Sequence, residues 1–422
     1  MLKEILSSNW LPADDAESLE QSCPEKLFFL QEEFIRHYYP IAQLPAEKLE
    51  FVIQKAAKFN EKKEIRLLCW YMYHRFSKTH IKKYQPFPEF IFQLGYDSGI
   101  LYLLIGLSVI PEYEARAERE NFPMRYAHDA ASRFGTFPTY FAQAFDGRFG
   151  IRARSLHFML HFKDSLMYRI GRFDFILEQA GDNFPHVYSR NGEFVLFCGN
   201  NWRMDSSGER LYPHVEPQQG EFVTRFSDDG NSVRGFLIQQ ERGFAQSVET
   251  VIPRSELEHI ASPGDWVLHV HIPAGGKMTP DVCRSSCLEA LEFFAEHHPE
   301  SPVKAIFTVS WIANDAWLDY IPNSNMAALI RSSALFPSPH SNNAGLFFVF
   351  GRDDSDFASY PRSNSLERAV LDCIKDNRPL RAPGMLFRFF SDEKKAWQKK
   401  ARSGRVRCPT GQCESPLTIP HR

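Results

Sequence analysis

The amino-acid sequence predicts an α+β protein in which an all-helical domain precedes a mixed β-sheet domain flanked by helices. Three observations support this class. Apolar residues recur every three to four positions in the first part of the chain, β-forming runs take over near Gly147, and strand-like and helix-like runs then alternate. We expect the helical domain over residues 1–147, the sheet domain over 148–391, and a basic tail with little periodicity over 392–422.

The first part of the chain contains a succession of helix-forming segments. Residues 64–76 are apolar nearly all round, which predicts a central helix. The most apolar run, 99–110, is too short to span a bilayer and predicts a buried helix, with Pro111 as a breaker. Further helices are expected over 25–39, 45–59, 121–134 and 137–145.

The second part is richer in β-forming residues. Residues 221–240 predict a hairpin that turns at Asp229 and Gly230. Gly171 interrupts the run 166–179, where we expect a bulge or a close approach of another chain segment. Strands are expected over 154–162, 166–179, 192–199, 265–271, 303–311 and 345–351, and helices after residue 279 and over 364–376.

Composition and charge exclude several classes of protein. The formal net charge is −3, so no bulk positive field favours nucleic acid or an anionic membrane, and we expect no nucleic-acid partner and no membrane span. Eight cysteines are scattered without a CxxC pair, and the N-terminal segment lacks an apolar signal sequence, which predicts a cytoplasmic protein with reduced thiols. The 37 phenylalanines suit a thick core or an apolar ligand tunnel.

The stretch 265–294 carries two histidines on a predicted strand. His269 and His271 point to the same face and could hold one metal together, as in cupin proteins. A metal site needs a third or fourth ligand, and no acidic residue follows until Asp281. We therefore expect no metal. Two partly buried structural histidines remain an alternative, and Cys283 and Cys287 are expected in the core.

A Gly-Gly loop and a helix follow that strand. Gly275 and Gly276 allow backbone N–H groups to approach a phosphate, and the start of the helix favours an anion. Lys277 can add a positive charge, and Thr279 is suited to cap the helix ahead of Pro280. No Walker or GxGxxG pattern is present, so neither a P-loop nor a Rossmann site is indicated.

Several segments resemble a little-characterised bacterial acyltransferase family. They are "YRIGRFDF" (168–175), residues 264–294, "TVSWIAND" (308–315), "IPNSNM" (321–326) and "FFVFGR" (347–352). Members of the family join a helical N-terminal domain to a GNAT-like C-terminal domain. The resemblance implies transfer of an acyl group from acyl-CoA, as co-substrate, to a small-molecule or peptide amine by direct attack on the thioester. The usual [QR]xxGxG/A turn of GNAT proteins is replaced here by "HIPAGG".

The resemblance, together with the positions of the residues themselves, suggests roles for individual residues. The cofactor-binding candidates occupy the turn after the strand: Ile272, Gly275, Gly276, Lys277, Met278 and Thr279. His271 is the candidate base or proton relay and Tyr320 the candidate acid, although a structural histidine and a packing tyrosine are equally consistent with their sequence contexts. The substrate-binding candidates lie near Gly171 and at the end of a later strand: Arg169, Arg172, Ser310, Trp311 and Asn314.

Two alternatives to an enzyme of this class remain open. A GNAT-like domain that has lost catalysis could act as a binding or regulatory protein, with the helical part docking a partner. The missing [QR]xxGxG pattern favours that possibility. A metal-dependent cupin-like enzyme is the other. A homodimer is compatible with each of these three hypotheses.

Overall fold

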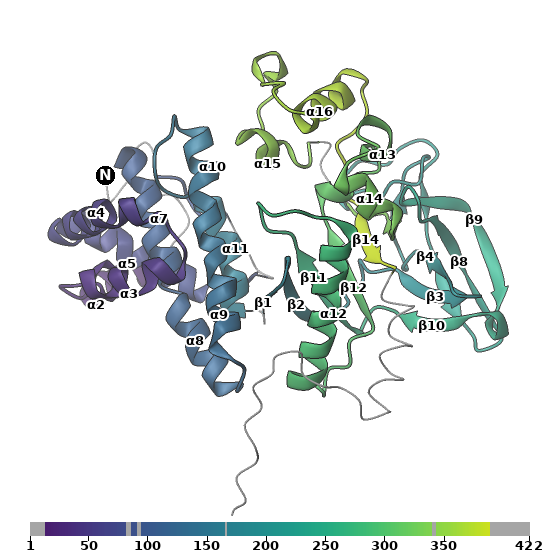
Figure 1. Cartoon of the computed structure of the whole chain (residues 1–422), viewed down its shortest axis with the longest axis horizontal. Helices are drawn as coiled ribbons and strands as arrows, with labels where there is room; N and C mark the ends of the chain where they lie inside the picture. Colours follow the sequence, from purple (N-terminus) through teal and green to yellow (C-terminus); the bar gives the residue numbers. More distant parts are fainter. Residues whose placement is uncertain (1–12, 82–85, 91–93, 165–166, 340–342, 389–422) are drawn as a thin grey trace, which may run out of the picture.

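The fold was obtained as a computed structural model, which describes residues 13–388 except 82–85, 91–93, 165–166 and 340–342. The tail predicted over 392–422 lies outside the described residues. A helical part, drawn in purple and blue in Figure 1, stands beside a part built from two β-sheets and further helices. This agrees with the predicted α+β class. The last helix before the first sheet ends at Asp164, while the domain boundary at residue 147 stays a prediction.

The helical part is built around one fully buried helix. All ten residues of α7 (Ser98–Leu107) are buried, which confirms the buried helix predicted from the most apolar run. Pro111 stands in the first turn of the next helix, where a missing N–H costs little. The helices are α2 (Ala13–Ser22), α3 (Glu32–Ile41), α4 (Leu49–Glu61), α5 (Lys63–Lys78), α7, α8 (Ile110–Arg119), α9 (Met124–Ala131), α10 (Phe137–Ala144) and α11 (Ala153–Asp164), with the 3-10 turns η1 (Phe28–Leu30), η2 (Ala46–Lys48), η4 (Gly95–Asp97) and η5 (Ser132–Thr136).

The prediction of a strand over 154–162 is wrong, because this segment forms α11. Its apolar residues alternate, but Leu156, Met159 and Leu160 also recur at helical spacing, and all three are buried. The helix packs closely on α7: a Cβ atom added to Gly106 would collide with the Met159 side chain. The sequence of this segment fits both a strand and a helix, and packing against α7 therefore decides in favour of the helix.

A six-stranded sheet carries the predicted strand–turn–helix stretch. Its order is β1 (Met167–Ile170), β2 (Phe173–Gln179), β11 (Trp266–His271), β12 (Ala305–Val309), β14 (Gly384–Phe387) and β13 (Ser333–Phe336). β11 and β12 are parallel, and the other neighbours are antiparallel. The run 166–179 is thus not one bulged strand but a hairpin. Gly171, with φ of +57°, lies in its turn, and a Cβ there would come within 3.1 Å of Ser286, which confirms the close approach.

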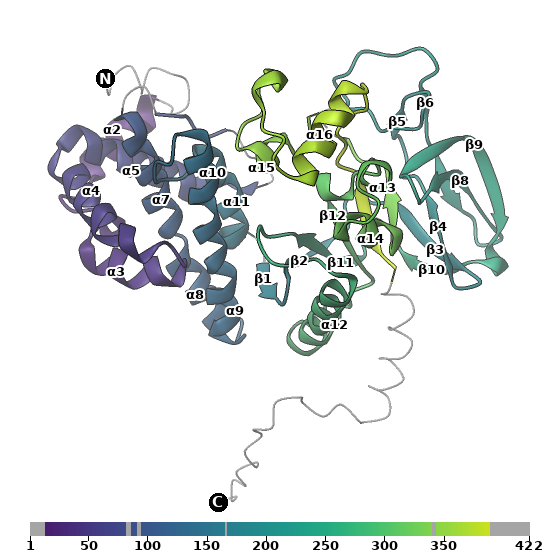
Figure 2. The ribbon, with the colours of Figure 1, turned by 45° about the horizontal axis from the view of Figure 1, so that its top comes forward.

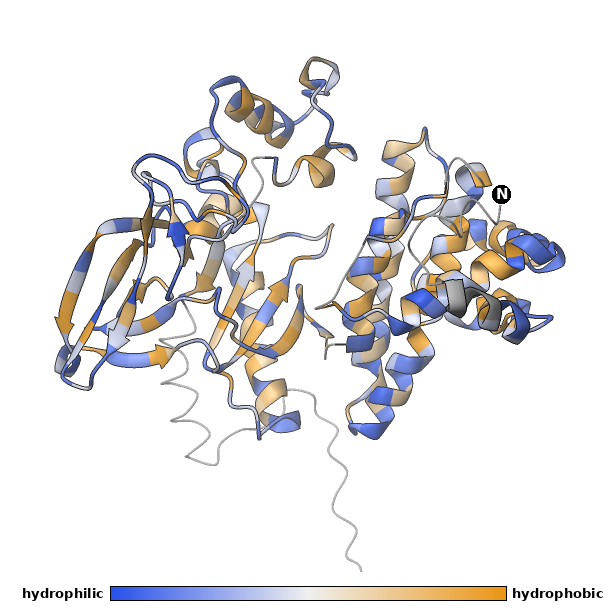
Figure 3. Ribbon diagram, turned by 180° about the vertical axis from the view of Figure 1, so that it is seen from behind, coloured by the Kyte–Doolittle hydropathy of each residue, from blue (hydrophilic) through white to orange (hydrophobic). Residues whose placement is uncertain are grey.

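A second sheet packs against the first one. It contains β10 (Glu258–Ala261), β3 (His186–Arg190), β4 (Glu193–Phe197), β8 (Ser232–Gln239) and β7 (Phe226–Asp228), with β9 (Phe244–Pro253) paired to β8 and a small ribbon of β5 (Arg203–Met204) and β6 (Phe222–Val223) nearby. The predicted turn at Asp229 and Gly230 joins β7 to β8. Phe184, Phe307 and Phe336 belong to the core shared by the two sheets. In Figure 3, the strands of both sheets carry hydrophobic segments between hydrophilic ones, and many of the connecting loops are hydrophilic.

Helices complete the C-terminal part: α12 (Pro280–His297), α13 (Trp317–Tyr320), α14 (Asn325–Arg331), α15 (Leu346–Phe350) and α16 (Ser365–Lys375), with the turns η6 (Arg254–Glu256), η7 (Trp311–Ala313) and η8 (Phe357–Ser359). The strand predicted over 345–351 is instead the short helix α15. Gly345 and Gly351, with φ of +95° and +72°, bound it, and such angles end an extended run. Cys283 and Cys287 of α12 are buried in the core, as predicted.

The helical part and the first sheet share one core. Buried residues of α7, α9 and α11 belong to the same cluster as Leu268 and Val270 of β11 and the buried face of α12. Tyr126 of α9 packs on Phe293 of α12 with ring centroids 4.5 Å apart. Figure 2 shows α10 and α11 on one side of the ends of β11 and β12, with α15 close to them. This arrangement brings residues of both parts to one place.

Candidate active site between the helical part and the sheet

A cavity of about 1260 Å³ opens where β11 and β12 separate. Their parallel register ends at the pair His269 and Phe307, although both strands continue for two more residues. The residues after this point on each strand line the cavity, which leaves part of each strand edge facing it. Helices α10 and α11 and the segment around α15 form the remaining walls. A cleft at the carboxyl ends of parallel strands is a frequent ligand site.

The Gly-Gly turn forms one wall of this cavity. Gly275 and Gly276 have φ of +74° and +71°, in the left-handed region that favours glycine. Apart from the glycine and its two chain neighbours, no described residue has an atom within 4 Å of a Cβ placed on Gly275. Thr279 occupies the N-cap position of the 18-residue α12 and Pro280 is its first residue, as the sequence predicted, but the Thr279 side chain makes no capping hydrogen bond. The loop is thus exposed glycine-rich backbone leading into a long helix, which is suited to an anion.

Two positive side chains flank the turn. Lys277 and Arg172 both line the cavity, and the Cβ position of Gly276 is 3.5 Å from Nε of Arg172. Arg172 is held in place because its Nη2 donates to the carbonyl of Pro273 at 2.8 Å and its backbone N–H donates to Oγ of Ser286 at 3.1 Å. Burial lowers the pKa of Arg172, but the guanidinium remains a cation.

His271 lies at the end of β11, where it lines the cavity and packs against α11. Its ring is 5.4 Å from Phe158 and 5.0 Å from His161, centroid to centroid. Burial, followed by the neighbouring His269 and His161, holds the pKa of His271 well below its usual range. The ring is therefore neutral near pH 7. Its Nε2 is buried and has no hydrogen-bond partner in the described part of the chain.

The other histidines around this point are also shielded from water. His161 has a pKa lowered to about 4, mainly by burial, and burial lowers the pKa of His157 as well. His269 stacks on Phe307 and its Nδ1 is 3.2 Å from Oε1 of Glu178. Among the residues that the structure describes, no group of three or more histidine, cysteine or acidic side chains has the geometry to hold a metal ion.

An ionic cluster underlies the cavity next to His271. Asp174, which is opposite His271 in the strand register, is completely buried. Its Oδ2 accepts a hydrogen bond from Nη1 of Arg133 at 3.0 Å, and its Oδ1 accepts one from Nε of Arg169. Arg133 lines the cavity, whereas Arg169 lies behind it. The hairpin at Gly171 thus directs Arg169 to an internal ion pair and Arg172 to the cavity.

The remaining predicted site residues divide into two groups. Ile272, Met278, Ser310 and Trp311 line the cavity with the turn glycines and Lys277. Three others do not line it: Thr279, Asn314 and Tyr320.

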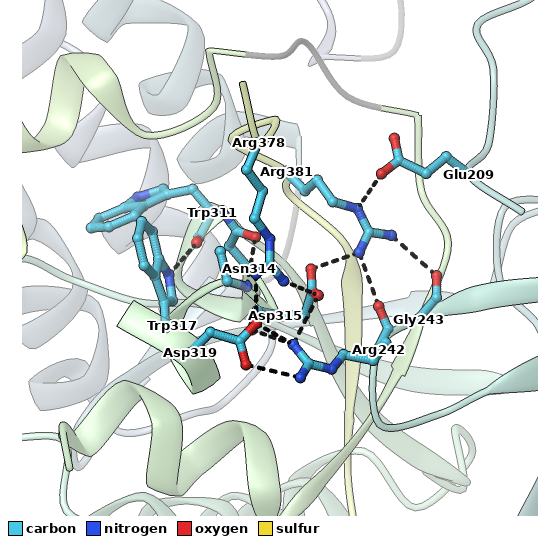
Figure 4. A network of polar contacts seen from close by, with 11 residues as sticks. Glu209, Arg242, Gly243, Trp311, Asn314, Asp315, Trp317, Asp319, Arg378 and Arg381 are labelled. Atoms are coloured by element: carbon cyan, nitrogen blue, oxygen red, sulfur yellow. Dashed lines mark hydrogen bonds and ion pairs between the residues drawn. The ribbon is translucent and has the colours of Figure 1, made fainter. Parts of the chain in front are cut away.

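The last two of these belong to other parts of the structure. The Tyr320 hydroxyl donates to Asp376 at 2.8 Å, and this bond raises the pKa of Tyr320 to about 12. Asn314 is buried next to an ionic network, shown in Figure 4, in which Asp315 binds Arg242, Arg378 and Arg381.

Aromatic residues from three helices supply an apolar section of the wall. They are Phe137 and Tyr140 of α10, Phe158 of α11, and Phe347 and Phe348 of α15. Trp311 stacks on Phe348 with ring planes 9° apart. No sequence motif marked these residues, nor Arg133, His157 or Arg154, as part of the site. Only the abundance of phenylalanine indicated an apolar ligand tunnel, and it did not indicate which residues would form one.

Two comparisons with known proteins agree with this architecture. A solved acyltransferase in complex with decanoyl-CoA and teicoplanin is similar over 83% of this chain and 86% of its own, with a TM-score of 0.56 and 16% identity. A mutant acyltransferase in complex with octanoyl-CoA matches over 84% and 87%, with the same TM-score and identity. At this level of identity the likeness concerns the fold. No curated protein matches the sequence.

The sequence itself identifies the family. Residues 167–386, more than half of the 422-residue chain, match the family model of the GNAT-like C-terminal domain. The match begins at β1 and ends within β14, so it spans both sheets, the Gly-Gly turn and α12. No helix of the described residues is long and apolar enough to cross a membrane. The chain therefore belongs to the family of proteins with a GNAT-like C-terminal domain.

Proposed function

We propose that the protein is an acyl-CoA-dependent N-acyltransferase. The observation that carries this proposal is the Gly275–Gly276 turn, which faces a cavity between two separating strands and leads into the N-terminus of α12. Backbone N–H groups of this turn, with Arg172 and Lys277, suit the pyrophosphate of CoA. The solved structures of similar fold are acyltransferases bound to CoA or acyl-CoA, which supports the same use of the site here.

The pantetheine arm then follows the free edge of β11 toward His271. The amine attacks the thioester carbonyl carbon, the C–N bond forms, the C–S bond breaks, and CoA leaves as a thiol. The amine loses one proton and the thiolate gains one, so a single group can carry the proton between them. Neutral His271, whose buried Nε2 has no partner in the described structure, suits this role. Tyr320 is not assigned a role because it lies outside the cavity.

The aromatic wall suits the acyl group. Phe137, Tyr140, Phe347 and Phe348 offer apolar surface at the part of the cavity formed by α10 and α15. The similar solved structures hold octanoyl-CoA and decanoyl-CoA, which are of medium chain length. We propose a medium-chain acyl-CoA as the donor. Each buried methylene contributes about 0.8 kcal/mol, so binding is expected to tighten as the acyl chain lengthens.

Titration calorimetry with CoA, acetyl-CoA, decanoyl-CoA and a desulfo analogue tests the proposal. We expect all four to bind, with decanoyl-CoA the tightest. Release of free thiol from decanoyl-CoA in the presence of an amine panel then tests transfer. Binding without transfer to any amine would favour the alternative of a non-catalytic binding protein. The weak basicity of His271 and the absent [QR]xxGxG pattern are the observations that favour a non-catalytic binding protein. Failure of all four to bind would overturn the proposal.

A further inference from the structure

Three arginines lie near one buried carboxylate beside the cavity, and two of them bind it. Asp174 forms ion pairs with Arg133 and Arg169. Arg172 is close enough that the two other arginines lower its pKa further, after burial itself. Three guanidinium groups and one carboxylate leave an excess of two positive charges in a poorly solvated region. Uncompensated charge of this kind is costly unless a ligand of opposite charge completes the site.

Several N–H groups of this cluster lack an acceptor. Nε of Arg133, Nη2 of Arg169 and Nε of Arg172 are buried and have no hydrogen-bond partner within the described residues. Buried polar groups without partners are rare and call for an explanation. The described lining of the cavity contains one acidic residue, Asp353, and it is 3.5 Å from Arg154. Among the described residues that line the cavity, none therefore supplies a second carboxylate to the arginine cluster.

The two arginines of this cluster that line the cavity, Arg133 and Arg172, have different neighbours. Arg172 lies next to Gly276, where the CoA phosphates are proposed to bind. Arg133 lies over the ring of Phe158 at 4.9 Å, and the same ring contacts His271 at 5.4 Å. Arg133 is therefore near the group proposed to handle the proton of the reaction. An anion bound by Arg133 would therefore lie close to His271, where the amine is proposed to react.

We infer that the acceptor carries a carboxylate close to its amine, as an amino acid does, and that Arg133 binds this carboxylate. Nη1 of Arg133 is fixed by Asp174, and its buried Nε makes no hydrogen bond within the described structure. The helical part would thus select the acceptor while the sheet binds the cofactor. This inference rests on the proposed function, and it extends that function by naming the chemical class of the amine.

The test compares amines that differ only in the carboxylate. Free-thiol release from decanoyl-CoA is measured with each common L-amino acid and with its α-amide, and products are identified by mass spectrometry. The amine of an amide loses its proton more readily, so intrinsic reactivity favours the amide. We expect the opposite order, with kcat/KM for at least one amino acid about tenfold or more above that of its amide, as for loss of a charged hydrogen bond.

Variants then assign the effect to Arg133. Arg133→Gln should raise KM for the amino acid to the level of its amide while the Kd for CoA stays within about twofold. Arg133→Lys, which keeps the charge, should restore part of the preference. Arg125→Gln, at an exposed arginine of the same helical part, is the matched control and should change neither value. Thermal unfolding of each variant reports whether the fold is retained.

The outcomes are separable. Amides accepted as well as amino acids by the unaltered protein would overturn the inference without any variant. Transfer to no amino acid by a protein that binds CoA would also overturn it. If Arg133→Gln weakened CoA binding as much as Arg172→Gln, the cluster would bind a CoA phosphate and the inference would be wrong. Absence of CoA binding to the unaltered protein would instead remove the proposed function on which the inference depends.

Discussion

The Gly-Gly turn offers the most direct test of the proposed cofactor site. Replacing Gly276 with valine introduces a β-branched side chain at φ of +71°. The new Cβ would be 3.5 Å from the nearest atom, Nε of Arg172, so space alone does not forbid it. The strain comes from the backbone, where such a conformation costs an L-residue about 1–2 kcal/mol. A valine relieves this strain by rotating the turn, which moves its N–H groups away from a bound phosphate.

The expected size of the effect follows from the bonds that are lost. A hydrogen bond to a charged group contributes about 1.5–3 kcal/mol, and each 1.4 kcal/mol is about tenfold in affinity. Loss of even one phosphate contact should therefore weaken CoA binding about tenfold or more. Titration calorimetry with CoA measures this change directly.

Gly264 provides a matched control for backbone strain. It lies in the turn before β11 and has φ of +93°. Among the described residues other than its chain neighbours, none has an atom within 4 Å of its Cβ position. Gly264→Val therefore carries a comparable backbone penalty at a position that does not line the cavity. We expect both variants to unfold at a similarly reduced temperature, but only Gly276→Val to lose CoA affinity. Unchanged CoA affinity in Gly276→Val would refute the assignment of the turn.

Three further predictions concern other parts of the molecule. His271→Asn should lower kcat about a hundredfold or more without changing the Kd for CoA, since proton transfer contributes about 10²–10⁴ in rate. Thiol release measures kcat and titration calorimetry measures the Kd, and an unaltered kcat would contradict the role. Asp174→Asn should lower the free energy of unfolding on the order of 3 kcal/mol in a urea titration, because it leaves two arginines beside a neutral group. Arg242 and Arg378 lower the pKa of Asp319 to about 2, so its contribution to stability is present above its ordinary pKa of 3.8 and is lost as pH falls toward 2. The difference in unfolding free energy between the unaltered protein and Asp319→Asn should therefore shrink between pH 4 and pH 2, and a difference that grew over this range would contradict the ion pair.

Local patterns determined much of the architecture. The helical periodicity of the first part, the hairpin at Asp229 and Gly230, and the strand–turn–helix around Gly275 are visible in the sequence because each depends on neighbouring residues. Glycine at a positive φ and a threonine N-cap are short-range requirements. The α+β class and the location of a candidate anion-binding turn could therefore be predicted, whereas the GNAT-like family was indicated by the resemblance of several segments.

Two segments show where local patterns were insufficient. Residues 154–162 satisfy both a strand and a helix period, and packing on Gly106 of α7 selects the helix. Residues 345–351 form a run of β-forming aromatic residues, yet two glycines at positive φ close it into the helix α15. In each case contacts or backbone angles outside the pattern outweigh a propensity that is worth little per residue.

The composition of the site itself was decided by tertiary structure. The sequence alone placed His271 next to the Gly-Gly turn and Arg172 in a predicted β-strand run. It therefore described the cofactor side of the cavity in outline. It could not indicate that Arg133 and Phe158 of the helical part face His271, more than 100 positions away in the chain. The sequence also could not predict that Arg169 binds a buried carboxylate, or that Tyr320 lies outside the cavity. Ion pairing and the packing of α11 on the first sheet determine these positions, and both depend on residues that meet only in the folded protein.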